Sequence, residues 1–108
     1  MSVNKVILLG HVGQDPTVRY PEKDFAVAAF SLATNEVNGP NRIETTEWHR
    51  IIASGRLGTL AERYIRKGTM LYIEGKLRTR EYEDKMSITR RITEIYADKI
   101  ELLGRKNQ

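Results

Sequence analysis

The sequence contains no cysteine, and this absence removes several kinds of site at once. Without a thiol the chain can form no disulfide, bind no zinc through cysteine and use no cysteine nucleophile. Such a composition fits a reducing compartment, so we expect a cytoplasmic protein.

Long hydrophobic runs are also missing. No stretch approaches the roughly 20 apolar residues that a helix needs to cross a bilayer. The first five residues lack the hydrophobic region of a signal peptide. We therefore expect a protein that is not exported and has no membrane partner.

The usual sequence signatures of enzymes are absent as well. The chain has no glycine-rich phosphate loop ending in Lys-Ser or Lys-Thr, no His-Glu-x-x-His and no Gly-x-Ser-x-Gly. Its two histidines, His11 and His49, have no second type of ligand at metal-binding spacing. The prediction is a protein that is not an enzyme, with no metal and no cofactor. A nuclease using Glu81, Glu83 and Asp84 is the rival, although a charged hairpin tip is normally just solvated.

What the chain does contain suits one basic domain. It has 108 residues, 40% of them hydrophobic, which is enough for a modest core. Lys and Arg number 18 against 14 Asp and Glu, giving a formal net charge of +4. This balance permits nucleic-acid binding, but the distribution of the charge matters more than its total.

The hydrophobic pattern predicts five strands and one helix. Leu57, Leu60 and Ala61 recur at helical spacing. The sequence Thr59-x-x-Glu62 matches a capping box at the start of a helix, and Gly68 is a residue typical of a helix end. The order of elements predicts an all-β domain with one short helix, an OB-fold five-stranded barrel, over residues 1–103, followed by a frayed end at 104–108. The predicted strands cover residues 5–12, 25–34, 45–53, 70–82 and 87–102, the last one with a bulge.

Alternation along the fourth predicted strand separates two faces. Its even-numbered positions carry Lys76, Arg78, Arg80 and Tyr82. Three cations beside an aromatic ring suit a polyanion whose bases can stack, as in a single nucleic-acid strand.

The only tryptophan, Trp48, has two possible roles. Most tryptophans are largely buried, so composition alone favours a place in the core. However, Trp48 shares a strand face with Arg50, which is poor core material. That pairing favours an exposed ring that stacks on bases.

Several motifs, in order from residue 3 to about residue 103, resemble bacterial single-stranded-DNA-binding proteins. Together they are highly specific. They are Val3-Asn4-Lys5-Val6-Ile7-Leu8, Gly13-Gln14-Asp15-Pro16, Arg19-Tyr20, Leu32-Ala33-Thr34, Thr46-Glu47-Trp48-His49-Arg50, Tyr64-Ile65-Arg66-Lys67-Gly68, Tyr72-Ile73-Glu74-Gly75 and Leu77-Arg78-Thr79-Arg80.

The resemblance implies a homotetramer that wraps single-stranded DNA without sequence preference during replication, repair and recombination, in the bacterial cytoplasm at the nucleoid. It implies stacking by Trp48 and Tyr82. It places His49 and Tyr72 at subunit contacts, and the edge of the apolar first strand, with Val6 and Leu8, fits the same role. The basic positions that it implies along the DNA path are Lys5, Arg19, Arg50, Arg56, Lys67, Arg78, Arg80 and Arg90, to which the strand pattern adds Lys76.

The chain departs from the family pattern at several points. Two positions that carry an aromatic residue in the family fall near Asn38 and at Ser54, so both aromatic rings are missing here. A position that carries a lysine in the family is Glu81. The last residues, 105–108, are not the acidic, hydrophobic tail that recruits replication and repair proteins, so we do not expect such recruitment. A dimeric protein adaptor of the primosome-accessory type is the alternative function, and RNA is an alternative ligand because stacking and phosphate contacts barely distinguish the sugar.

Overall fold

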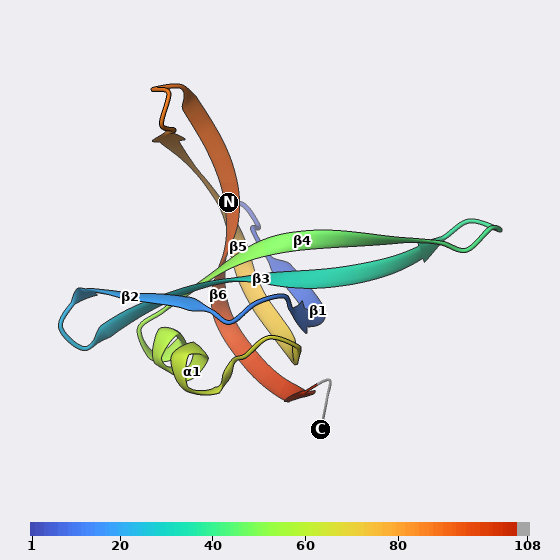
Figure 1. The fold of residues 1–108 in the computed structure, drawn as a ribbon, viewed down its shortest axis with the longest axis horizontal. Helices are drawn as coiled ribbons and strands as arrows, with labels where there is room; N and C mark the ends of the chain where they lie inside the picture. The colour runs from blue at the N-terminus through green and yellow to red at the C-terminus, as the bar shows by residue number, and fades with distance from the viewer. Residues whose placement is uncertain (106–108) are drawn as a thin grey trace.

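The structure is a computed structural model that describes residues 1–105, and it is an all-β fold with one short helix (Figure 1). The fold class predicted from the sequence is therefore confirmed. The elements are β1 (Val6–Val12), β2 (Thr17–Glu22), β3 (Phe25–Asn38), β4 (Ile43–Ser54), α1 (Arg56–Tyr64), β5 (Thr69–Glu83) and β6 (Thr89–Arg105).

The count of five strands was too low because β2 was missed. This strand pairs antiparallel with the start of β3, from Thr17 opposite Ala29 to Glu22 opposite Phe25. Its residues are mostly exposed, so it has no hydrophobic pattern to reveal it. Pro21 falls where the pairing register shifts, a position that an edge strand tolerates. Residues 13–16, which separate β2 from β1, belong to no strand.

The strands form one sheet that closes on itself. Their order is β1-β5-β6-β4-β3-β2, and β1 also pairs with β3. β1 therefore closes the ring by pairing with two strands. Val6 lies opposite Gly75 of β5, while Val12 lies opposite Leu32 of β3. β4 and β6 run parallel, with Ile51 opposite Ile95.

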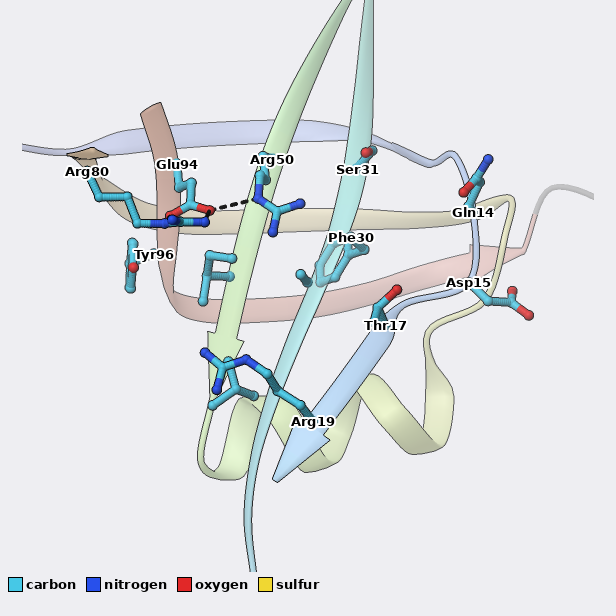
Figure 2. Close-up of a pocket in the computed structure, with 13 residues that line it drawn as sticks. Gln14, Asp15, Thr17, Arg19, Phe30, Ser31, Arg50, Arg80, Glu94 and Tyr96 are labelled. Carbon is cyan, nitrogen blue, oxygen red and sulfur yellow. Dashed lines mark hydrogen bonds and ion pairs between the residues drawn. The ribbon is translucent and has the colours of Figure 1, made fainter. Parts of the chain in front are cut away.

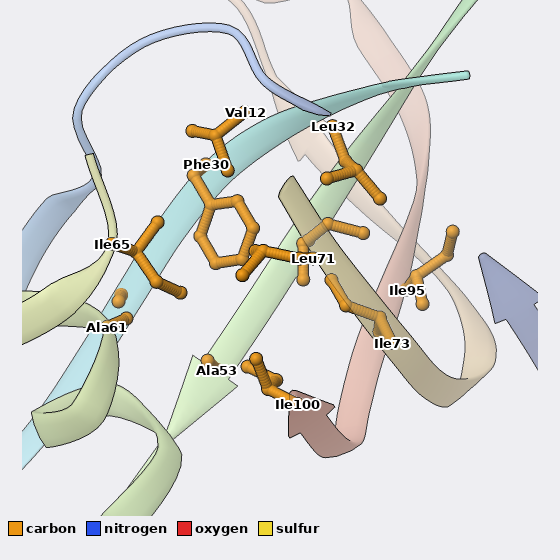
Figure 3. Packing of buried hydrophobic residues seen from close by; sticks show 12 residues of the cluster. Val12, Phe30, Leu32, Ala53, Ala61, Ile65, Leu71, Ile73, Ile95 and Ile100 are labelled. Atoms are coloured by element: carbon orange, nitrogen blue, oxygen red, sulfur yellow. The ribbon is translucent and has the colours of Figure 1, made fainter. Parts of the chain in front are cut away.

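The core fills the inside of this ring (Figure 3). Leu32 of β3, Ile51 of β4, and Leu71 and Ile73 of β5 are fully buried there. Aliphatic side chains in such a position stabilise the fold by leaving water and packing closely. Helix α1 covers one end of the ring, where Ala61 adds to the same cluster.

The helix lies where its hydrophobic spacing predicts, but its first residues differ from the expectation. The capping box was wrong, because Gly55 is the N-cap and no side chain caps the helix. Thr59 is inside the helix and its N–H donates to the Gly55 carbonyl at 3.0 Å. Within residues 1–105 no helix is long and apolar enough to cross a membrane.

The hairpin of β5 and β6 contains the predicted bulge. Glu74 pairs with Lys99, but the next residue, Gly75, pairs with Ala97. One residue of β6 is thus skipped, and Ile95 and Ile100 can both be buried although their positions have opposite parity.

At the hairpin tip, the Asp84 carboxylate accepts hydrogen bonds from the backbone N–H groups of Met86 (2.9 Å) and Ile88 (3.0 Å). At the other end of the hairpin, β6 continues through Gly104 and Arg105. Residues 106–108 lie outside the described part of the chain, so the frayed end stays a prediction.

Candidate nucleic-acid interface

The register of the sheet aligns polar and aromatic side chains from neighbouring strands on one face. Arg78 of β5 lies opposite Glu94 of β6, and Lys76 lies opposite Tyr96. On the other side of β6, the parallel pairing with β4 puts Ile52 opposite Tyr96. Side chains of paired residues stand on the same side of a sheet. This face therefore runs across three adjacent strands.

An open cleft of about 660 Å³ lies on this face (Figure 2). Three arginines reach it from different strands: Arg19 from β2, Arg50 from β4 and Arg80 from β5. A concave surface with several cations suits an anionic ligand. The complete lining is Gln14, Asp15, Thr17, Arg19, Val27, Ala29, Phe30, Ser31, Arg50, Ile52, Arg80, Glu94 and Tyr96.

Two of these arginines share the carboxylate of Glu94, which is only 1% exposed. Nε of Arg50 donates to Oε2 at 2.7 Å, and Nε of Arg80 donates to Oε1 at 3.1 Å. A longer contact of 3.4 Å joins Nη2 of Arg80 to Oε2. Burial raises the pKa of Glu94, but the hydrogen bonds from Arg50 and Arg80 outweigh it and the pKa is lowered. Glu94 is therefore a buried anion between two half-exposed cations.

Two further arginine–aromatic contacts lie beside this cluster. The guanidinium carbon of Arg78 is 4.7 Å from the ring centre of Tyr96, and that of Arg80 is 5.8 Å from the ring centre of Tyr82. In such cation–π contacts the guanidinium is attracted to the face of the ring. Tyr96 was not among the predicted site residues. Tyr96 is two residues from Glu94, so simple alternation along β6 would have placed both on the same face of the sheet. The bulge in β6 made it unclear from the sequence which residues share a face.

Trp48 is on the surface, with 58% of the residue exposed. The alternative that it fills the core is wrong. On β4 it is two residues from Arg50 and lies opposite Ala33 of β3. Its ring rests against the backbone of Gly13, where an added Cβ would come within 2.5 Å of the indole. An accessible ring thus stands near the arginine cleft, supported from one side.

Comparisons with known proteins agree with this geometry. A family model described as the single-strand binding protein family matches residues 3–103. The chain belongs to this family.

Among curated relatives, a single-stranded DNA-binding protein of Bacteroides thetaiotaomicron is 51% identical over 98% of this chain and 69% of its own length. Two proteins of the same name from Neisseria meningitidis serogroups A and B are each 43% identical over all of this chain and 64% of theirs. The chain thus spans about two thirds of the length of these relatives. A solved structure titled as the Plasmodium falciparum SSB complex with single-stranded DNA matches with a TM-score of 0.82 and 36% identity, covering 96% of each chain.

The remaining basic residues predicted for the family's DNA path do not line the cleft. Lys5 is paired with Glu74 at 3.0 Å, and Arg90 is paired with Asp84 at 2.9 Å near the hairpin tip. Arg56 begins α1 and Lys67 follows its end. The contact of these four residues with DNA stays a prediction.

The residues predicted for subunit contacts lie on β1, β4 and β5. Nε2 of His49 is 2.9 Å from Oγ1 of Thr34, and the Tyr72 hydroxyl donates to Glu74 at 2.5 Å. That hydrogen bond raises the pKa of Tyr72, and burial adds to the rise. Both polar groups thus have partners within the chain.

On β1, Val6 and Leu8 pack against the chain's own core. The exposed side chains of this strand are instead Ile7 and Leu9, at 59% and 56%. The role of Val6 and Leu8 in a subunit contact stays a prediction, and Ile7 and Leu9 are the side chains free to meet another surface.

The acidic cluster considered for a nuclease is divided between ion pairs. Glu81 pairs with Arg91 at 3.3 Å and Asp84 with Arg90 at 2.9 Å. Among residues 1–105, no three potential metal-ligating side chains of His, Cys, Asp or Glu gather in one place.

Proposed function

We propose that this chain binds single-stranded DNA without sequence preference and protects exposed strands during replication, repair and recombination. The observation that carries the proposal is the exposed ring of Trp48 on the same strand face as Arg50, beside a cleft lined by Arg19 and Arg80. Family membership supports the same ligand.

The mechanism combines two interactions that read no base sequence. Guanidinium groups neutralise phosphates, and this releases condensed counterions from the strand. Trp48 and Tyr82 offer flat faces to bases, and every base can stack on such a face. The arginines that line the cleft provide the first interaction and the two rings the second.

A titration at several salt concentrations tests the proposal. Labelled oligonucleotides of mixed sequence and of oligo-dT should bind with similar affinity, and an excess of duplex should compete poorly. The plot of log affinity against log salt should fall with a slope of about −0.7 per neutralised phosphate. A flat salt response, or equal preference for duplex, would contradict the proposal.

We further infer assembly as a homotetramer in the bacterial cytoplasm, associated with the nucleoid. The exposed apolar side chains of β1 support a contact between copies, because exposed apolar residues on a sheet edge favour association. Solution mass tests the assembly. A dimer that exchanges oligonucleotide for a protein ligand would instead favour the adaptor of the primosome-accessory type.

The proposed protein is a binder and not an enzyme. The pairing of Glu81 and Asp84 with arginines supports this, since it leaves those carboxylates engaged. Incubation with single strands and Mg²⁺ checks it: the DNA should remain intact, and cleavage would favour a nuclease.

A further inference from the structure

We propose that Glu94 is a positioning residue for DNA binding, whose buried carboxylate holds Arg50 and Arg80 in the orientation that meets the phosphates of the strand. This inference rests on the proposed function and deepens it. Glu94 itself need not touch DNA, because it acts through the two arginines.

The position of Glu94 in the sheet suits this role. It lies on β6, between β4, which carries Arg50, and β5, which carries Arg80. Each carboxylate oxygen accepts an Nε–H from a different arginine, at 2.7 and 3.1 Å. One buried group thus fixes two side chains from opposite sides, as Figure 2 shows.

The contacts leave guanidinium groups available for a ligand. Among residues 1–105, Arg50 has a hydrogen bond only at Nε, and Arg80 only at Nε and Nη2. The other N–H groups have no partner in this part of the chain, and the side chains are 43% and 49% exposed. Two cations and one anion leave a local charge of +1, which still attracts phosphate.

Holding the arginines in place before DNA arrives favours binding. A free arginine side chain loses much rotamer freedom when it is immobilised by a ligand. A side chain already fixed by the protein has lost that freedom during folding, so less is lost on binding. Burial of Glu94 favours keeping both ion pairs with Arg50 and Arg80, because a buried carboxylate without its partners is strongly disfavoured.

Two simple arguments predict opposite effects for the substitution Glu94→Gln. If Glu94 were only a negative charge under a polyanion site, its removal would tighten DNA binding. If it positions the arginines, removal weakens binding although the net charge of the protein rises. A glutamine has only one acceptor oxygen, and its amide N–H₂ faces a second guanidinium donor, so at least one arginine is released.

The experiment compares wild type with E94Q and with E81Q as a matched control. Glu81 carries the same charge on the same hairpin, but it is exposed, pairs with Arg91 and does not line the cleft. For E94Q we expect an increase of roughly tenfold in the Kd for oligo-dT, the effect of losing one charged hydrogen bond. Its salt slope should become shallower by about 0.7, one phosphate contact. For E81Q we expect equal or tighter binding and an unchanged slope.

Equal or tighter binding by a folded E94Q would overturn the inference while leaving the proposed function intact. Failure of the wild type to bind oligo-dT would instead overturn the proposed function. Thermal unfolding of each variant shows whether it is folded at the temperature of the titration.

A measurement on the wild type alone decides the matter if E94Q does not fold. In the free protein, the Nε–H protons of Arg50 and Arg80 should exchange slowly with water in NMR spectra, unlike that of the exposed Arg56. Rapid exchange at Arg50 and Arg80, like that of a free arginine, would show that they are not held and would refute the positioning role.

Discussion

The ring of Trp48 occupies the space that a side chain at Gly13 would need. A Cβ placed on Gly13 would lie 2.5 Å from Cζ3 and 2.9 Å from Cη2 of the indole. Gly13 follows β1 in the chain, whereas Trp48 is on β4, so the loop after β1 supports the ring. The absence of a side chain at position 13 is therefore part of the candidate DNA-binding site.

Gly13→Ala should displace the indole and weaken binding to single-stranded DNA. The expected loss is part of the stacking energy, below about 1–3 kcal/mol. Thermal stability should change little, because the ring is at the surface. Fluorescence titration and thermal unfolding measure the two effects. In a Trp48→Ala background, Gly13→Ala should have no further effect on affinity, and an additive loss would show that it acts elsewhere.

Trp48→Ala should weaken binding by about 1–3 kcal/mol if one base stacks there. The salt slope should stay the same, because no cation is lost. Since Trp48 is the only tryptophan, DNA should quench the tryptophan fluorescence of the wild type. Trp48→Phe serves as the control: any quenching at tryptophan wavelengths that persists in this variant would be an artefact.

Arg78→Gln should weaken binding and make the salt slope shallower by about 0.7, one phosphate contact. Arg91→Gln is the matched control, since Arg91 is on the same hairpin but is 75% exposed and pairs with Glu81. Its slope should equal that of the wild type. Equal slopes for all three proteins would exclude Arg78 from the DNA path.

The stability of the fold should fall in acid, and Asp84 and Glu94 should contribute to this. The Arg90 side chain and the Ile88 and Met86 amides lower the pKa of Asp84, and the arginines lower that of Glu94 against the effect of burial. Both carboxylates therefore bind protons more weakly in the folded state than in the unfolded state. Their stabilisation is present above the unfolded pKa values and is lost as pH falls through the lower folded values.

Denaturant unfolding from pH 7 down to pH 2 measures this dependence. The curve for Asp84→Asn should be flatter than that of the wild type over the acidic range. If the two curves are parallel, the hydrogen bonds at the hairpin tip do not contribute as described.

Gly58→Ala should destabilise the protein, although alanine is normally the better helix residue by about 1 kcal/mol. Gly58 is buried in α1, and an added Cβ would lie 2.3 Å from the carbonyl oxygen of Ala26 and 3.0 Å from that of Ala53. The neighbouring Thr59 is exposed on the same helix, so Thr59→Ala should leave stability equal or slightly higher. Chemical denaturation compares the two, and a stabilised Gly58→Ala would mean that α1 shifts away from the sheet without loss.

Several features of the fold could be predicted because they depend on local patterns. The spacing of Leu57, Leu60 and Ala61 was enough to locate α1. Alternation along β5 separated the arginines from the core. The face shared by Trp48 and Arg50 was a better guide than the usual burial of tryptophan, since Arg50 must reach water.

Other features depended on contacts that no local pattern reveals. The polar strand β2 is held by pairing with β3 rather than by burial of its own side chains. Glu94 looked like any strand carboxylate, because its partner Arg50 is 44 residues away and meets it only through the parallel pairing of β4 and β6. Tyr96 lies just before a bulge, where simple alternation fails.

The position of β1 has a consequence for how this chain folds. β3–β4 and β5–β6 are hairpins of neighbouring segments, which can form early from local contacts. β1 must then pair with β5 and β3 at once, bringing together residues that are far apart in the sequence. Closing such long loops costs conformational entropy before the contacts form, and this slows folding. Folds rich in such pairings typically take roughly milliseconds to seconds to form. β1, although it precedes its partner strands in the chain, should therefore be among the last strands to pair.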